Sequence, residues 1–167
     1  VRDKDSVSAC TLFGEIAAWA KEKGRSMYQL LEDIYLEYGY SKEVGISLVR
    51  KGKEGADEIE AMMKRFRNNP METLGGSPIT LIKDFARLEA TDFMRNERVA
   101  LEMPTTSNVL QYFTEDGSKL SIRPSGTEPK IKFYIEVKGS ARTREELVQA
   151  EEEANGKINA IRQELGI

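Results

Sequence analysis

One stretch of the sequence, residues 120–137, limits the fold of this chain more than any other: LSIRPSGTEPKIKFYIEV. Runs rich in β-branched and aromatic residues stand on both sides of a short segment of Arg, Pro, Ser, Gly and Thr, and such runs favour strands. In the second run apolar and polar side chains alternate, as they do in a strand with one buried face. The apolar set is Ile131, Phe133, Ile135 and Val137, and the other set is Lys130, Lys132, Tyr134 and Glu136. The pattern therefore predicts a stiff arch held between two strands of a sheet.

Hydrophobic periodicity predicts a pair of helices before this sheet and an α+β domain around it. Helical spacing covers residues 7–20, 26–38, 54–67 and the segment from Thr143 onward, and strand patterns cover 44–48, 75–89, 109–113, 119–123 and 130–137. The stretch 89–108 has no clear period and is predicted to be mostly loop. From residue 43 onward the order is strand, helix, four strands and helix, which predicts an antiparallel or mixed sheet covered on one face by two helices.

Composition excludes several classes of protein. The net charge of −3 over 167 residues argues against a broad nucleic-acid surface or a polybasic membrane surface. No histidine is present, so the commonest general base and the commonest zinc ligand are both missing. Cys10 is the only cysteine, which prevents an intrachain disulfide, and no apolar run is long enough to span a bilayer. We therefore expect a cytoplasmic protein without nucleic-acid or membrane partners.

The segment between the two strands carries groups that suit a phosphate. Arg123 offers a planar fork of donors, and Ser125 and Thr127 offer hydroxyls. Gly126 is expected to let the backbone take up conformations closed to other residues, so that successive N–H groups converge on an anion. The segment is therefore a candidate anion site.

Local charge supports this interpretation but leaves another one open. Lys132, on the second strand, adds a further positive charge. Over residues 120–138 four cations stand against two carboxylates, although the whole chain is acidic. A simpler interpretation is that Ser, Gly, Thr and Pro are ordinary turn residues and that Arg123 pairs with Glu128.

The string RPSGTEPKIKFY resembles the phosphate-binding loop in the C-terminal domain of the α-D-phosphohexomutases, the phosphoglucomutase and phosphomannomutase family. The longer stretch SNVLQYFTEDGSKLSIRPSGTEPKIKFYIEV resembles the bacterial members throughout. The opening VRDKDSVSA resembles the segment after the sugar-specificity loop of their third domain. The resemblance covers nearly all of this chain but only about the last third of such an enzyme, and the missing initiator Met also suggests a fragment.

The resemblance implies a four-domain enzyme that isomerises hexose 1-phosphates and hexose 6-phosphates. A phosphoserine in the first domain transfers its phosphoryl group, Mg²⁺ held in the second domain assists, and hexose 1,6-bisphosphate is the intermediate. Residues 1–41 would be the helical end of the third, α/β domain. Residues 42–167 would be the fourth domain, with a TATA-box-binding-protein-like fold, which grips the phosphate that does not react.

Site residues carry over from the family by position. Arg123, Ser125, Gly126 and Thr127 match the loop that binds the distal phosphate, and Lys132 stands where the family has Arg or Lys. Lys4 matches a lysine of the substrate pocket. No residue of this chain matches a catalytic group or a metal ligand, so the resemblance implies a hexose phosphate substrate, the other three domains as partners, and no activity for the fragment alone.

Two alternatives belong to other classes of protein. One is a stand-alone anion-binding or regulatory module that shares the loop. The other is an RNA-binding domain with a small sheet, which the lack of a stacking platform and of a basic surface disfavours. The helical pair at 7–38 favours the mutase fragment, because a self-contained module has no need of two apolar helices without a sheet.

Overall fold

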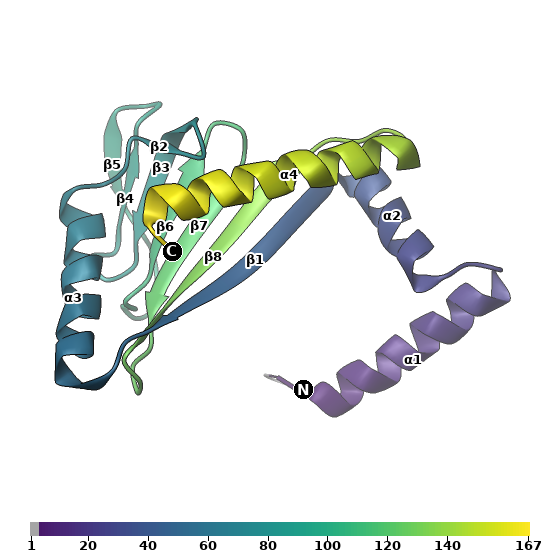
Figure 1. The fold of residues 1–167 in the computed structure, drawn as a ribbon, viewed down its shortest axis with the longest axis horizontal. Helices are drawn as coiled ribbons and strands as arrows, with labels where there is room; N and C mark the ends of the chain where they lie inside the picture. Colours follow the sequence, from purple (N-terminus) through teal and green to yellow (C-terminus); the bar gives the residue numbers. More distant parts are fainter. Residues whose placement is uncertain (1–3) are drawn as a thin grey trace. The chain divides into compact units, whose positions relative to one another are not determined.

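The computed structural model describes residues 4–167, and these divide into two compact units. The first unit comprises the described residues up to Tyr40 together with Ser140–Ala150, and the second comprises Ser41–Gly139 and Glu151–Ile167. The helices are α1 (Ser6–Glu22), α2 (Met27–Tyr38), α3 (Gly52–Asn68) and α4 (Arg144–Leu165) (Figure 1). The strands are β1 (Tyr40–Val49), β2 (Thr73–Leu74), β3 (Ser77–Asp84), β4 (Glu89–Asp92), β5 (Glu97–Ala100), β6 (Leu110–Thr114), β7 (Lys119–Pro124) and β8 (Lys130–Gly139).

Both helices of the pair in the first unit begin at side-chain caps. The carboxylate of Asp5 accepts a hydrogen bond from the backbone N–H of Ser8 at 3.2 Å, which satisfies a free donor of the first turn of α1. At α2 the Ser26 hydroxyl accepts from the N–H of Gln29, and the Gln29 side chain accepts from the N–H of Ser26. This reciprocal arrangement is a capping box, so the predicted start of α2 is confirmed.

Large apolar side chains of α1 and α2 remain uncovered. The side chains of Phe13, Trp19 and Ile34 are 61%, 51% and 52% exposed, and Ala20 is the one buried residue on the two helices. An amphipathic helix gains most of its stability by burying its apolar stripe. Within the described chain, the stripe of this pair has little to pack against.

The second unit is built on one antiparallel sheet with the strand order β1-β8-β7-β6-β3-β4-β5, to which β2 adds beside β3 (Figure 1). The end of β1 is joined to the start of β8, because the N–H of Arg50 donates to the carbonyl of Pro129 at 2.9 Å. The α+β class is confirmed, with the sheet antiparallel.

The core lies between this sheet and the helices α3 and α4. Ile131, Phe133, Ile135 and Val137 are at most 2% exposed, which confirms the predicted inner face of β8. The ring of Phe66, on α3, meets that of Phe133 edge-on at 6.2 Å. Tyr112 donates its buried hydroxyl to the carbonyl of Phe66 at 2.7 Å, and burial raises the pKa of Tyr112, which keeps this donor protonated.

Helix α4 follows the predicted pattern. Its buried positions recur at helical spacing and include Leu147, Ala154, Ile158, Ile161 and Leu165. The Thr143 hydroxyl accepts from the N–H of Glu146 at 3.3 Å, so the helical segment predicted from Thr143 onward begins at a side-chain cap. Among the helices of residues 4–167, none is both long and apolar enough to cross a membrane.

The prediction that residues 89–108 are mostly loop missed a short hairpin, although most of the stretch is turn or loop. It contains the hairpin β4–β5, and the strand predicted over 75–89 ends at Asp84. Every residue of β5 is exposed, so this strand has no buried face that would require apolar and polar residues to alternate in its sequence. The turn is set by Asp92, whose carboxylate accepts two backbone N–H groups, and by Asn96 at φ 53°. The predicted order therefore lacks β2, β4 and β5 as separate strands.

The outer face of the sheet carries an ion cluster that predicts a response to acid. Glu136 pairs with both Lys119 and Lys138, and these contacts hold the pKa of Glu136 below its ordinary value of 4.5. A carboxyl with a lowered folded-state pKa contributes stability above about pH 4.5, and that contribution disappears as the pH falls through the lower value. We expect Glu136→Gln to lose up to about 1 kcal/mol at pH 7 and to unfold with a weaker acid dependence. Thermal melts between pH 3 and pH 7 test this, with the exposed Glu152→Gln as the control; equal acid profiles for wild type and Glu136→Gln would contradict it.

Candidate phosphate-binding site

The arch predicted between the two strands connects β7 to β8 and is held at its base. The N–H of Ser125 donates to the carbonyl of Lys130 at 2.7 Å, which closes the arch across the strand pair. The N–H of Lys130 donates to the carbonyl of Glu128, also at 2.7 Å. Together with the bond from Arg50 to Pro129, these contacts fix both ends of the segment.

The hydroxyl of Ser125 organises the middle of the arch. Its oxygen accepts from the N–H of Thr127 at 3.4 Å and from the N–H of Glu128 at 3.3 Å, and both bonds are long. In the described part of the chain, the N–H of Gly126 has no hydrogen-bond partner. The arch therefore offers one open amide and two weakly bound ones to an incoming acceptor.

The argument that Gly126 supplies an unusual backbone conformation is wrong, because its φ lies outside the left-handed region. The glycine matters for space instead. A Cβ built at Gly126 would have no heavy atom within 4 Å, so open volume lies in front of this residue.

Two cations stand side by side at the end of the arch. Arg123 on β7 is the direct cross-strand partner of Lys132 on β8. Within residues 4–167 neither side chain has an ion pair or hydrogen bond, and the pairing of Arg123 with Glu128 expected from the simpler interpretation is not formed. Glu128 pairs with Lys130 at 2.6 Å, and this ammonium lowers the pKa of the Glu128 carboxyl. Like charges directly opposite each other destabilise a sheet, so this pair favours a bound anion.

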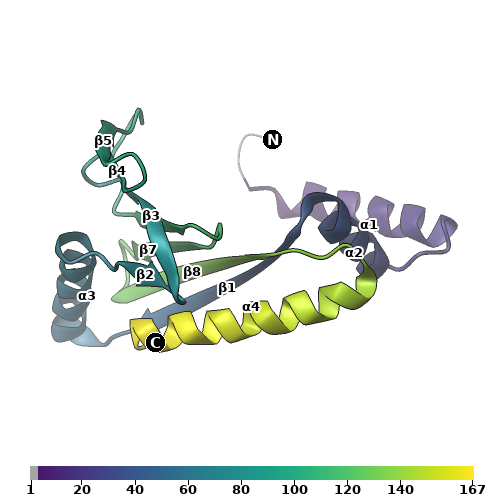
Figure 2. The same ribbon diagram turned by 90° about the horizontal axis from the view of Figure 1, so that it is seen from above.

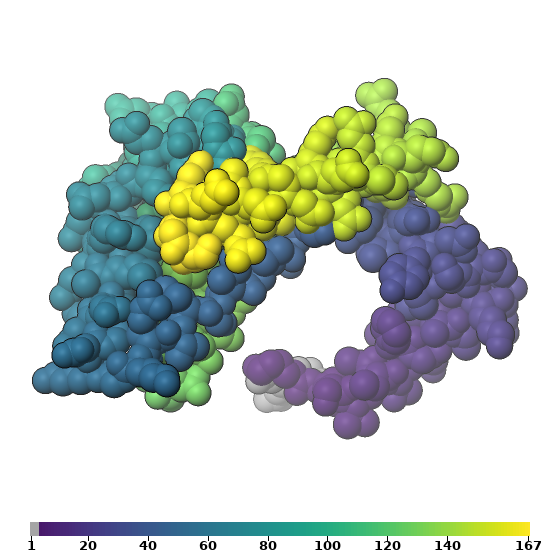
Figure 3. Space-filling model, viewed as in Figure 1, coloured from purple at the N-terminus to yellow at the C-terminus, as the bar shows by residue number. Residues whose placement is uncertain are grey.

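The arch also forms one wall of a cavity of about 320 Å³. Residues Ser125–Pro129 line it on one side, and Gly52, Ala56 and Ile59 of α3 line it on the other. Figure 3 shows the light green atoms of the arch at the surface beside the blue atoms at the start of α3. Arg123 and Lys132 do not line this cavity, because they lie on the sheet face opposite the core.

The structure thus pairs Arg123 with Lys132 across two strands and places Ser125, Gly126 and Thr127 beside a cavity that these two cations do not line. Lys4 belongs to the first unit, where it is exposed and precedes the cap of α1. The first three residues of the stretch VRDKDSVSA lie outside the described residues. The contribution of α3 was missed, because Gly52 lies about seventy positions before the arch and no local pattern connects the two.

No metal centre accompanies the arch. The described chain contains no group of three or more Asp, Glu or Cys side chains placed to hold a metal ion.

Comparison with known proteins identifies the domain. Residues 50–154 match the family model for "Phosphoglucomutase/phosphomannomutase, C-terminal domain". The chain is 34% identical over 138 residues to a phosphoglucomutase of Staphylococcus aureus (strain bovine RF122 / ET3-1), covering 83% of the chain and 25% of that protein. It is 31% identical over 135 residues to a phosphoglucomutase of Staphylococcus haemolyticus (strain JCSC1435), covering 81% of the chain and 24% of that protein.

A solved structure gives a weaker likeness. The phosphoglucomutase pp63/parafusin of Paramecium in its open form aligns with 96% of this chain and 28% of its own length, at 14% identity and a TM-score of 0.46. The chain spans about a quarter of the length of the curated relatives it matches. On the strength of the sequence matches, this chain belongs to the phosphoglucomutase/phosphomannomutase family, and it contains that family's C-terminal domain.

Proposed function

We propose that the chain is the C-terminal part of a phosphoglucomutase or phosphomannomutase and that its arch binds the non-reacting phosphate of a hexose phosphate. The carrying observation is the cross-strand couple of Arg123 and Lys132, which forms no ion pair in the described residues and flanks in sequence an arch with an open amide at Gly126. A phosphate dianion satisfies the two charges and the N–H group at once. The match to a C-terminal domain model favours this role over an independent anion-binding module.

Each group of the arch has a definite task in this proposal. The guanidinium of Arg123 donates two parallel hydrogen bonds to phosphate oxygens, while Lys132 contributes a compact charge. Ser125 and Thr127 orient the phosphate with hydroxyls and amides. Phosphoryl transfer depends largely on positioning and charge stabilisation, so a firm grip on the distal phosphate directs the reacting one toward its partner group.

The remaining parts of the reaction are assigned to other domains. We infer that the phosphoserine and the Mg²⁺ of the parent enzyme come from domains 1–3, and that this chain alone is inactive. Lys4 is proposed to reach the sugar only in the complete enzyme. The parent reaction is isomerisation of hexose 1- and 6-phosphates through hexose 1,6-bisphosphate in the cytoplasm.

The domain boundaries follow the same proposal. Residues 1–41 are assigned to the end of the third domain and 42–167 to the fourth. The exposed apolar stripe of α1 and α2 supports this assignment, because the sheet of a third domain would cover Phe13 and Trp19.

A binding comparison tests the proposed role. Calorimetric titration of the 167-residue chain should detect glucose 1,6-bisphosphate at millimolar concentrations and no binding of unphosphorylated glucose. Lys132→Ala is expected to weaken the bisphosphate complex about 3- to 10-fold, since one partly solvated charge pair is lost. Equal binding of glucose and its bisphosphate would refute the phosphate grip.

The open space in front of Gly126 leads to a separate prediction. Gly126→Ala should fold normally, because the φ angle suits alanine and no atom blocks the added methyl group. The melting temperature is expected to stay the same or to rise slightly, since alanine restricts the unfolded chain. Phosphate binding should weaken, because the methyl group occupies the approach to the amide. Unchanged bisphosphate affinity in this variant would exclude that approach.

A further inference from the structure

The sheet of the second unit is wider than its two covering helices. Figure 2 shows β4 and β5 at the end of the sheet that lies away from α4. On the side of β3, β4 and β5 that continues the inner face of the core, side chains of these strands and of the C-terminal end of α3 leave a hollow between them. A cavity of about 340 Å³ lies there, within the size range of small-molecule sites.

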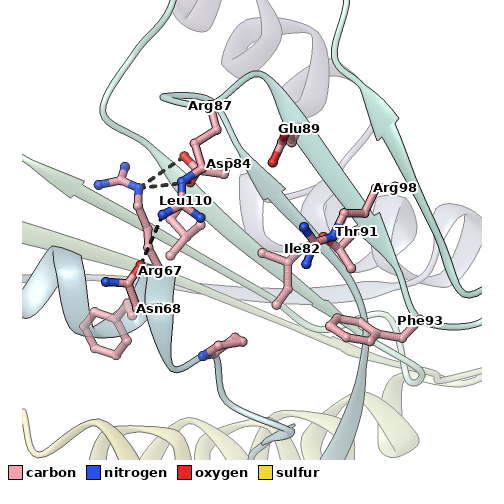
Figure 4. Close-up of a pocket in the computed structure, with 12 residues that line it drawn as sticks. Arg67, Asn68, Ile82, Asp84, Arg87, Glu89, Thr91, Phe93, Arg98 and Leu110 are labelled. Atoms are coloured by element: carbon pink, nitrogen blue, oxygen red, sulfur yellow. Dashed lines mark hydrogen bonds and ion pairs between the residues drawn. The ribbon is translucent and has the colours of Figure 1, made fainter.

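Strand register explains which side chains line this cavity. Ile82 on β3 stands opposite Thr91 on β4, which stands opposite Arg98 on β5. Directly opposed residues of antiparallel strands share a face, so these three form one row across the cavity. Glu89 lies two positions before Thr91 and shares its face. Figure 4 shows Ile82, Thr91 and Arg98 close together, with Glu89 on the same side.

The cavity combines uncommitted charges with an apolar surface. In the described part of the chain, neither Arg98 nor Glu89 forms a hydrogen bond or ion pair through its side chain, even though both line the same cavity. Arg87 adds a guanidinium that is half exposed, donates to Asn68 at 3.1 Å and forms an ion pair with Asp84 at 3.6 Å. The ring of Phe93 is 49% exposed at one end.

Asp84, on the floor of the cavity, pairs with both Arg67 and Arg87. Three guanidinium groups therefore share the cavity with the Asp84 and Glu89 carboxylates, which leaves a local excess of one positive charge. The cavity thus has an anion-binding side and one carboxylate acceptor that requires a hydrogen-bond donor.

We propose that this cavity is a second ligand site, which binds a small organic anion through Arg98, Arg87 and Glu89. A carboxylate or phosphate of the ligand contacts the two guanidinium groups, and a hydroxyl or ammonium group beside it donates to the Glu89 carboxylate. The apolar body of the ligand packs on Ile82 and Phe93. None of these residues belongs to the arch, so the proposal does not depend on the phosphate grip.

Protection of the sheet edge is the competing explanation for Arg98. β5 is the last strand of the sheet, and charged residues on such strands prevent pairing with other chains. That role requires only a charge, whereas the ligand site requires the planar fork of arginine. Arg98→Lys keeps the charge and removes the fork, so this variant separates the two explanations.

Amide NMR titration of the 167-residue chain tests the site with three probes. L-leucine carries a carboxylate, an ammonium group and an apolar body; glucose 6-phosphate carries a phosphate and hydroxyls; inorganic phosphate is the anion alone. We expect L-leucine or glucose 6-phosphate to shift the amides of Thr91, Phe93 and Arg98 below about 20 mM. Inorganic phosphate should bind these residues at least about 10-fold more weakly, because it has no apolar body to pack on the cavity wall.

Substitutions at the cavity and at two control positions test which side chains bind the ligand. Arg98→Ala is expected to weaken the binding of the tighter-binding organic probe at least about 10-fold. Arg98→Lys and Glu89→Gln should each weaken it about 3-fold or more. Arg95→Ala, on the exposed turn of the same hairpin, and Arg123→Ala, in the arch, should leave these shifts unchanged. The site is overturned if no probe shifts the three amides, if Arg98→Lys binds as the wild type does, or if inorganic phosphate binds as tightly as the better probe.

Discussion

Arg123→Ala is expected to weaken the binding of glucose 1,6-bisphosphate by about 10- to 100-fold, the largest effect on binding that the account predicts. Two charge-assisted hydrogen bonds from one guanidinium are lost, and because the site is exposed, solvent screening reduces their joint contribution to about 1.4–2.7 kcal/mol. Arg123 is exposed and forms no side-chain contact with a carboxylate in the described residues, so its removal breaks no internal ion pair. The like-charge repulsion with Lys132 also disappears.

The melting temperature of Arg123→Ala distinguishes a phosphate-binding role of Arg123 from a role in supporting the fold. The melting temperature of Arg123→Ala should equal that of the wild type or exceed it, while the bisphosphate affinity falls. Arg162→Ala on the exposed side of α4 is the matched control and should change neither property. An arginine that merely supports the turn would produce the opposite pattern, a lower melting temperature with unchanged affinity.

Asp84→Ala is expected to lower the free energy of unfolding by about 3–5 kcal/mol, the largest effect on stability. The Nε–H of Arg67 donates a bifurcated hydrogen bond to the two carboxylate oxygens of Asp84, at 3.1 and 3.2 Å, and the N–H of Ala86 donates to the same carboxylate at 3.0 Å. The side chains of Asp84 and Arg67 are only 9% and 13% exposed. Removal of the carboxylate therefore leaves a poorly solvated guanidinium without its counter-ion.

A double-mutant cycle measures this pair. Arg67→Ala should also be destabilising, because it leaves the Asp84 carboxylate without its main donor and frees Asn108, which accepts from the same guanidinium at 2.5 Å. The double variant should lose less than the sum of the two single variants, with a coupling of about 1–3 kcal/mol from urea melts. Additive losses would show that the two side chains act independently.

Much of the second unit was predictable from local patterns. The hairpin β6–β7 joins two of the predicted strands through an Asp-Gly turn, in which Gly117 has φ 79° and the Asp116 carboxylate accepts from the N–H of Ser118. The arch was predictable because its two strands alternate so regularly. Both signals are short-range, so a single sequence contains all that is needed to see them.

The parts that were missed depend on distant contacts or on exposure. β4 and β5 are four residues each, and an edge strand exposed along its whole length has no hydrophobic period. Asp92 and Asn96 were the available turn signals. The cavity around Arg98 was not predictable, because it arises only when β3, β4 and β5 pair in register beside the end of α3.

The central claim, that the arch grips a phosphate, is tested most directly at the amide of Gly126. In an NMR titration with glucose 1,6-bisphosphate, this amide and that of Thr127 should shift most, and the apparent affinity should fall as salt is raised from about 0.01 M to 0.15 M because the arch charges are exposed. The account is contradicted if the Gly126 amide stays unchanged at about 10 mM ligand while the ligand binds elsewhere or not at all.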